Sequence, residues 1–183
     1  SHACRPTRPA LRTPPPRVIL YTVLAAHVLT FRRLDPDRDG DLAFARHRAA
    51  HVASFGNAVH CRSKSHYLRW VRAKVEEYPD GYVLATLGGR VAGQLELEIP
   101  YGKAVGYVNL FYVSPEFRRL GLGRRMHGEY LEPFFRSWEA RHIELHVSTT
   151  NGAASAFYRS LGYHRVTGEP PSGGRMRLMT KAL

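Results

Sequence analysis

Four arginines and two glycines surround a turn at residues 118–125, and residues of these types can hold phosphate. The turn Arg118-Arg119-Leu120-Gly121-Leu122-Gly123 follows an apolar, strand-like run that ends at Val113, and a helix-like segment begins at Arg124. Where a strand turns through glycines into a helix, bare backbone N–H groups and the positive end of the helix dipole point at the same place. The segment is therefore predicted to be a cradle for a pyrophosphate group.

The spacing of the glycines excludes two other phosphate-binding motifs. A dinucleotide-binding turn requires G-x-G-x-x-G, and a P-loop requires G-x-x-x-x-G-K-[ST]. This sequence reads R-x-x-G-x-G instead, with Val113, Pro115 and Glu116 just upstream.

A second segment further along the chain has the pattern of a strand followed by a short helix. Residues 142–147 alternate polar and apolar side chains, as a strand with one buried face should. Asn151 can then cap a helix, and Gly162 can close it. The apolar stripe of this predicted helix consists of Ala154, Phe157 and Leu161.

Together the two segments resemble the GNAT superfamily of acyl-CoA N-acyltransferases. The turn at 118–123 is similar to the coenzyme A loop of that family, although Arg119 stands where the family often has Gly and Leu120 where it often has Lys or Arg. Asn151, Tyr158 and Leu161-Gly162-Tyr163 are similar to its second motif, in particular that of the ribosomal-protein N-terminal acetyltransferases. The resemblance spans about residues 28–182 and implies an α/β (α+β) GNAT fold: one mixed sheet of about seven strands with about four flanking helices.

The resemblance implies transfer of an acetyl group from acetyl-CoA to a primary amine by direct attack in a ternary complex. Tyr158 would act as the general acid at the sulfur, and no metal would be needed. The acetyl-CoA-binding residues would be Val113, Arg118, Arg119, Leu120, Gly121, Leu122, Gly123, Arg124 and Asn151.

The sequence leaves the general base open. His146 lies where the ribosomal-protein acetyltransferases carry a catalytic Glu, and its unperturbed pKa suits proton transfer near neutral pH. Glu96 and Glu98 are the rival candidates, because they alternate with apolar residues and share one face of a strand. For each of them, the solvated face of an outer strand is the favoured interpretation. A bound water is a further alternative.

A non-catalytic, acyl-CoA-binding sensor or partner module is the alternative function. Tyr158 favours the enzyme, because binding alone requires no acid at the sulfur. The acceptor would be a small-molecule or peptide amine. Few carboxylates cluster near the motifs beyond Glu96, Glu98 and Glu144, which favours a less cationic acceptor.

Composition limits the other classes of function. The net charge is +12, and the 27 basic residues are 23 Arg and 4 Lys. These residues are scattered along the chain and do not form a basic stripe, so we predict no nucleic-acid partner. His47 and His51 lie four residues apart but lack the Glu of H-E-x-x-H and a third ligand, so no metal site is expected. Two cysteines without a pairing pattern favour a reducing, cytoplasmic location. No membrane partner is expected, and a homodimer stays open.

The predicted organisation is a basic, Pro- and Arg-rich disordered tail at 1–17 and one GNAT domain at 18–183. The apolar run 18–29 is too short to span a membrane, and it is expected to form or lead into a strand, with a signal peptide as the alternative. The pattern then predicts a strand at 29–33, a helix from Pro36 to Gly56, a helix from about Ser65, a hairpin over 82–99, and a helix interrupted at Pro133. The first helix is expected to bury Leu42, Ala45, Ala49, Val52 and Ala53.

Overall fold

The computed structural model describes residues 28–100, 104–167 and 175–183. Predictions for the tail at 1–17, the apolar run up to residue 27, and the turns at 101–103 and 168–174 lie outside these residues. In chain order the elements are β1 (Leu29–Arg33), α2 (Pro36–Phe55), α3 (Lys64–Glu77), β2 (Tyr82–Leu87), β3 (Arg90–Glu98), β4 (Val105–Val113), the 3₁₀ turn η1 (Pro115–Phe117), α4 (Leu122–Met126), the π-helical turn η2 (His127–Leu131), α5 (Glu132–Ser137), β5 (His142–Ser148), α6 (Gly152–Ser160), β6 (His164–Arg165) and β7 (Met176–Ala182).

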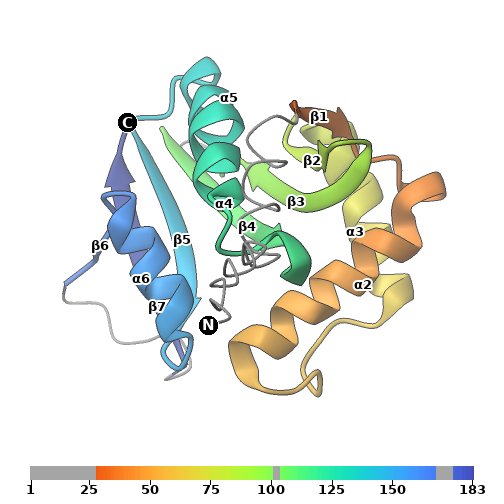
Figure 1. Cartoon of the computed structure of the whole chain (residues 1–183), viewed down its shortest axis with the longest axis horizontal. Coiled ribbons are helices and arrows are strands. Elements are labelled where there is room, and N and C mark those ends of the chain that lie inside the picture. The colour runs from red at the N-terminus through yellow and green to blue at the C-terminus, as the bar shows by residue number, and fades with distance from the viewer. Residues whose placement is uncertain (1–27, 101–103, 168–174) are drawn as a thin grey trace, which may run out of the picture.

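The strands form one mixed sheet in the order β1-β2-β3-β4-β5-β7-β6, which confirms the predicted seven-stranded sheet. All neighbouring strands are antiparallel except β4 and β5. The helices α2 and α3 pack on one face, around Tyr67, Val71 and Tyr82. The helices α4, α5 and α6 cover the other face, where the larger core lies (Figure 1). The two sides of the sheet therefore have separate cores.

The parallel strands β4 and β5 pair over only part of their lengths. Val105 to Val108 pair with His142 to Leu145, and there the pairing stops. Beyond that point β4 continues to Val113 beside β3 alone, and β5 continues to Ser148 beside β7 alone. The main chain of β4 from Asn109 onward is thus open on its β5 side within the described part of the chain.

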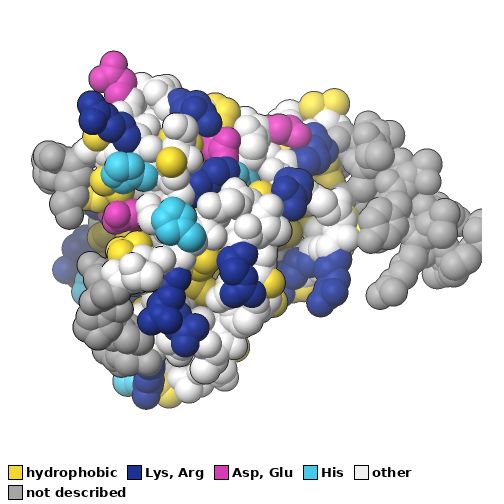
Figure 2. All heavy atoms as spheres, turned by 90° about the vertical axis from the view of Figure 1, so that its left-hand side faces the viewer, with side chains coloured by type: hydrophobic (Ala, Val, Ile, Leu, Met, Phe, Trp, Pro, Cys, Tyr) yellow, Lys and Arg dark blue, Asp and Glu magenta, His cyan; other side chains and the backbone are white. Residues whose placement is uncertain are grey.

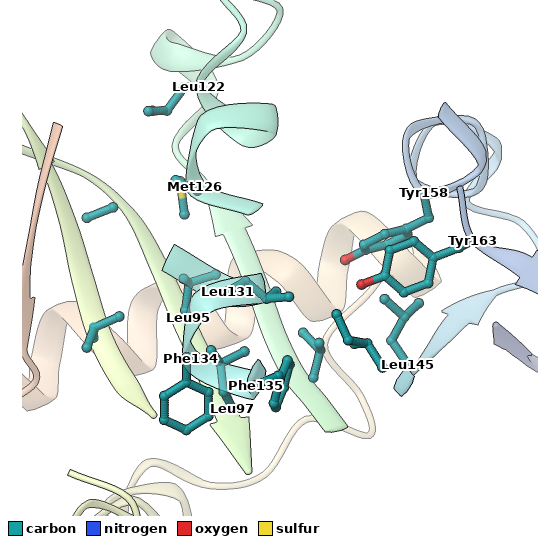
Figure 3. Close-up of a cluster of buried hydrophobic side chains, with 14 of the residues drawn as sticks. Leu95, Leu97, Leu122, Met126, Leu131, Phe134, Phe135, Leu145, Tyr158 and Tyr163 are labelled. Atoms are coloured by element: carbon teal, nitrogen blue, oxygen red, sulfur yellow. The ribbon is translucent and has the colours of Figure 1, made fainter. Parts of the chain in front are cut away.

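The helix after the turn at 118–123 is interrupted, as Pro133 predicts. Pro133 is the second residue of α5 and has no N–H to donate to the preceding turn. The chain widens into the π-helical turn η2 just before it, and then the helix resumes. Apolar side chains of all three pieces still point into one core against β3 (Figure 3): Leu122, Met126, Leu131, Phe134 and Phe135.

The prediction of which face of α2 is buried is wrong. Leu42 and Val52 are both 38 % exposed, whereas Asp39, Ala43 and Arg46 are buried. The buried polar groups have specific partners: both carboxylate oxygens of Asp39 accept hydrogen bonds from Arg32, and Nη2 of Arg46 donates to the carbonyl oxygen of Val91 at 2.7 Å. The helix therefore docks through ion pairs and hydrogen bonds in addition to the apolar contacts of Ala43 and Phe44, and a search for an apolar stripe does not detect the polar part.

The basic side chains are dispersed on the face that Figure 2 presents, where Lys and Arg lie among polar and apolar atoms. None of the described helices is both long and apolar enough to cross a membrane.

Candidate active site

The turn between β4 and α4 needs each of its two glycines for a different reason. Gly121 caps α4 with a φ of +80°, in the left-handed region that favours glycine. At Gly123 a Cβ atom would lie 3.1 Å from Cζ of Phe157, so a side chain there would press on α6. The backbone amides of the first turn of α4 have no intrahelical acceptors and face the outside of this turn.

Arg119 has a φ of +61°, which side-chain-bearing residues rarely adopt. This conformation explains why the resembling family often has Gly at the same place. The guanidinium of Arg118 bends back, and its Nε donates to the carbonyl oxygen of Val113 at 2.8 Å. Arg124 reaches α6, where its Nη2 lies 3.2 Å from Oγ of Ser160. The predicted cradle residues thus meet around one turn. Its two leucines lie inward, Leu120 half-buried and Leu122 in the core.

Asn151 acts as the N-cap of α6, since its Oδ1 accepts a hydrogen bond from the backbone N–H of Ala154 at 3.0 Å. The cap orients the helix so that Phe157 packs against Phe111 of β4, with ring centroids 5.6 Å apart. The side-chain NH₂ group of Asn151 makes no hydrogen bond to another described residue. Asn151 is therefore a structural cap whose side-chain NH₂ group is not used by other described residues.

Tyr158 of α6 lies beside the open stretch of β4. Its ring is in edge contact with Phe111 at 6.3 Å and with Tyr163 at 5.3 Å. Figure 3 shows the two tyrosines next to each other, with both hydroxyls pointing toward β4. Burial raises the pKa of Tyr158, so its hydroxyl keeps its proton at neutral pH. That hydroxyl makes no hydrogen bond to another described residue, and it is available to a ligand.

A β-bulge lies where β4 and β5 part. Val108 pairs with Leu97 and Leu110 pairs with Glu96, so Asn109 is the extra residue between them. A bulge bends its strand and redirects side chains, and bulges are common next to active sites. Here the bulge exposes Asn109 on the same side of the sheet as Glu96.

His146 lies one step past the end of the β4–β5 pairing. Its Nδ1 is 2.8 Å from the hydroxyl of Tyr107, and the two side chains bridge the strands. This partner could not be predicted from the sequence, because Tyr107 and His146 belong to strands that are distant in the chain.

Glu96 lies on β3, which is an inner strand, and is only 1 % exposed. The interpretation of a solvated carboxylate on an outer strand is therefore wrong for this residue. Oε1 of Glu96 accepts hydrogen bonds from the hydroxyl of Tyr67 at 2.6 Å and from Nε2 of Gln94 at 2.8 Å. Burial outweighs these two donors and raises the pKa of Glu96 to about 7. Glu98, by contrast, forms an ion pair with Lys74 at 2.9 Å.

A pocket of about 240 Å³ lies between the helix pair α2–α3 and the sheet. The ring of His47 stacks on Tyr67 at 4.5 Å, and burial lowers the pKa of His47 to about 4. His47 is therefore neutral at physiological pH. The pocket is lined by His47, His51, His60, Arg62, Trp70, Glu96 and Asn109. In the described residues no group of three or more His, Cys, Asp or Glu side chains is arranged to hold a metal ion.

Sequence reasoning did not place Glu96 in one pocket with these histidines, although one signal was present. Gln94, Glu96 and Glu98 place three polar side chains on one face of a strand that is otherwise apolar. If the strand is central, such a row must be buried and must have partners. Arg62, Trp70 and Asn109 carried no comparable signal, because only the fold brings them together.

The sequence matches the model of the acetyltransferase (GNAT) family over residues 45–163. It is similar to an uncharacterized N-acetyltransferase of Archaeoglobus fulgidus, with 29 % identity over 118 residues that cover 62 % of this chain and 75 % of the relative.

Solved structures share the fold. Ard1 from Thermoplasma volcanium superposes with a TM-score of 0.65 at 22 % identity, covering 85 % of this chain and 97 % of its own. The PaiA N-acetyltransferase from Thermoplasma acidophilum, solved in complex with coenzyme A, superposes with a TM-score of 0.63 at 17 % identity, covering 85 % and 99 %. The family model covers more than half of the chain, and the sheet, the turn and the capped helix agree with it: this chain belongs to the acetyltransferase (GNAT) family.

Proposed function

We propose that this protein is an N-acetyltransferase that moves an acetyl group from acetyl-CoA to a primary amine by direct attack in a ternary complex. The observation that carries the proposal is the opening between β4 and β5. The phosphate-binding turn and Tyr158 lie on one side of the sheet there, and the pocket of Glu96 and Asn109 lies on the other. A thioester held at the opening would meet an acid from one side and an amine from the other.

The residues around the turn fit acetyl-CoA. The amides of the first turn of α4 would hold the pyrophosphate, and the approach is open because Gly121 has no Cβ. The open main chain of β4 up to Val113 would pair with the pantetheine arm as an added strand would. The free amide nitrogen of Asn151 would donate to the same ligand. The coenzyme A complex of the PaiA enzyme, which has this fold, supports the assignment.

The reaction requires two proton transfers. The neutral amine nitrogen forms a bond to the carbonyl carbon of the thioester, and the C–S bond breaks. The nitrogen loses a proton to a general base, and the sulfur gains a proton from the hydroxyl of Tyr158. The products are the N-acetylated amine and coenzyme A. Tyr158 is assigned the acid role because it lies beside the open stretch of β4 and its hydroxyl is protonated at neutral pH.

We assign the base to Glu96 rather than His146. Glu96 lines the pocket, and its pKa of about 7 matches the requirement for a base that works near neutral pH. His146 is not among the lining residues, and its Nδ1 is already hydrogen-bonded to Tyr107. Its role in this proposal is to hold β4 and β5 in register at the end of their pairing.

The test is release of free coenzyme A by purified protein, followed with a thiol-reactive dye, with acetyl-CoA and a panel of primary amines. The expected result is release that depends on the amine and saturates in both substrates. If acetyl-CoA raises the melting temperature and no amine promotes release, the protein is the non-catalytic acyl-CoA-binding module. If acetyl-CoA produces no shift at saturation, the assignment of the cofactor site is wrong.

A further inference from the structure

We infer that the acceptor is a primary amine that also carries an anionic group, and that Arg62 binds this group at the mouth of the pocket. This inference rests on the proposed function, because it names the substrate class of the same site.

Arg62 makes no ion pair with a described carboxylate, and its charge acts on the buried Glu96 only at longer range. Its guanidinium carbon lies 4.8 Å from the centre of the Trp70 ring, and the contact orients the planar group at the pocket. No carboxylate in the described part of the chain forms an ion pair with it. An arginine that is held on an aromatic ring and lacks an acidic partner is suited to bind a carboxylate or a phosphate through two parallel hydrogen bonds.

The pocket offers no second carboxylate for a polycationic acceptor. Glu96 is the single acid among the described lining residues, and its Oε1 is already bonded to Tyr67 and Gln94. Neighbouring acids are already engaged: Glu98 pairs with Lys74, and Asp41 pairs with Lys64. A diamine bound with one nitrogen near Glu96 would thus bring its other ammonium toward Arg62.

The remaining lining residues supply neutral donors. Burial lowers the pKa of both His47 and His51, so their rings stay uncharged at neutral pH and each keeps one N–H. An anion near Arg62 would find these donors, together with the exposed His60. The proposed base, Glu96, therefore lies at the inner end of the pocket, and the positive charge of Arg62 lies at its mouth.

The test compares three amines of equal length that differ only at the far end: γ-aminobutyrate, its uncharged amide, and putrescine. A second pair, the C-terminally amidated peptides Gly-Asp-Gly-NH₂ and Gly-Asn-Gly-NH₂, separates a peptide acceptor from a small molecule, and only the first of the two carries an anionic group. The variants are Arg62→Gln, Arg62→Lys, and the control Arg69→Gln, which changes an exposed arginine of α3 outside the pocket lining. The readout is kcat/KM for each amine, with the melting temperature as a check of folding.

We expect kcat/KM to be about tenfold or more higher for the anionic amine than for the other members of its set. Arg62→Gln removes that preference by raising KM for the anionic amine alone, Arg62→Lys keeps part of it, and Arg69→Gln changes nothing. The inference is overturned if the amide or putrescine serves equally well, or if Arg62→Gln leaves the ratio of kcat/KM between the anionic amine and the other amines unchanged, since a shared change in kcat would reflect only the longer-range effect of Arg62 on Glu96. Absence of transfer to all five amines would contradict the proposed function and, with it, this inference.

Discussion

The hydroxyl of Tyr67 donates a 2.6 Å hydrogen bond to the carboxylate of Glu96, and the two side chains are almost fully shielded from solvent. The ring of His47 covers Tyr67 from α2, and Nε2 of Gln94 donates to the hydroxyl oxygen of Tyr67 and to Oε1 of Glu96. The proposed base is thus held by residues of three elements and not by its own strand alone. Its pKa of about 7 results from burial acting against two hydrogen-bond donors.

Glu96→Gln should lower kcat by at least about a hundredfold, because the amide cannot accept the proton. In the unsubstituted protein the rate should rise with pH through about 7, since the base works only when it is ionised. The variant should lose this inflection. A pH–rate profile measures both effects. Glu98→Gln is the matched control, and a larger loss in that variant would move the role to Glu98.

Tyr67→Phe should shift the inflection to higher pH, because it removes a donor that stabilises the ionised carboxylate. The base itself remains, so kcat at high pH should recover most of its original value. A profile that falls uniformly at all pH values would contradict this positioning role.

Tyr158→Phe should lower kcat by about a hundredfold or more and leave the Kd for acetyl-CoA nearly unchanged, because only the acid hydroxyl is lost. Calorimetry gives the Kd, and steady-state kinetics gives kcat. His146→Ala is the companion variant. If it abolished the inflection near neutral pH while Glu96→Gln retained it, the base would be His146.

Gly123→Ala should weaken acetyl-CoA binding and destabilise the fold by about 1–3 kcal/mol, because the new Cβ would press on Phe157. Gly128→Ala, in the same interrupted helix, has nothing within 4 Å of the new Cβ and should be near neutral. Urea unfolding and calorimetry compare the pair. Equal effects of the two substitutions would show that the close packing of Gly123 is unimportant.

The buried side chain of His127 should make the folded protein less stable in mild acid. It is 2 % exposed, its Nε2 lies 2.9 Å from the hydroxyl of Tyr163, and burial lowers its pKa to about 4. The unfolded chain takes up the proton near pH 6.5, so the free energy of unfolding falls as the pH drops from about 6.5 to about 4, by up to about 1.4 kcal/mol per pH unit. His47 contributes in the same direction. In His127→Gln, the free energy of unfolding measured with urea should depend less steeply on pH. An unchanged dependence on pH would contradict the assignment.

The order of the elements, the glycine turn before α4 and the cap at Asn151 could be predicted from the sequence, because these depend on local signals: glycines, a proline and apolar alternation. It failed where long-range contacts decide. The buried face of α2 is set by the partners of Asp39 and Arg46 on the strands. The position of Glu96 depends on β3 being an inner strand, and the bulge at Asn109 depends on its register with β3. None of these relationships is encoded within a short window of sequence.

The most direct test of the central claim is mass spectrometry of the reaction mixture after incubation with acetyl-CoA and γ-aminobutyrate. Transfer by direct attack predicts N-acetylated amine and free coenzyme A in equal amounts, with both reduced together in Glu96→Gln. Free coenzyme A without N-acetylated amine, or equal product from Glu96→Gln, would contradict the account.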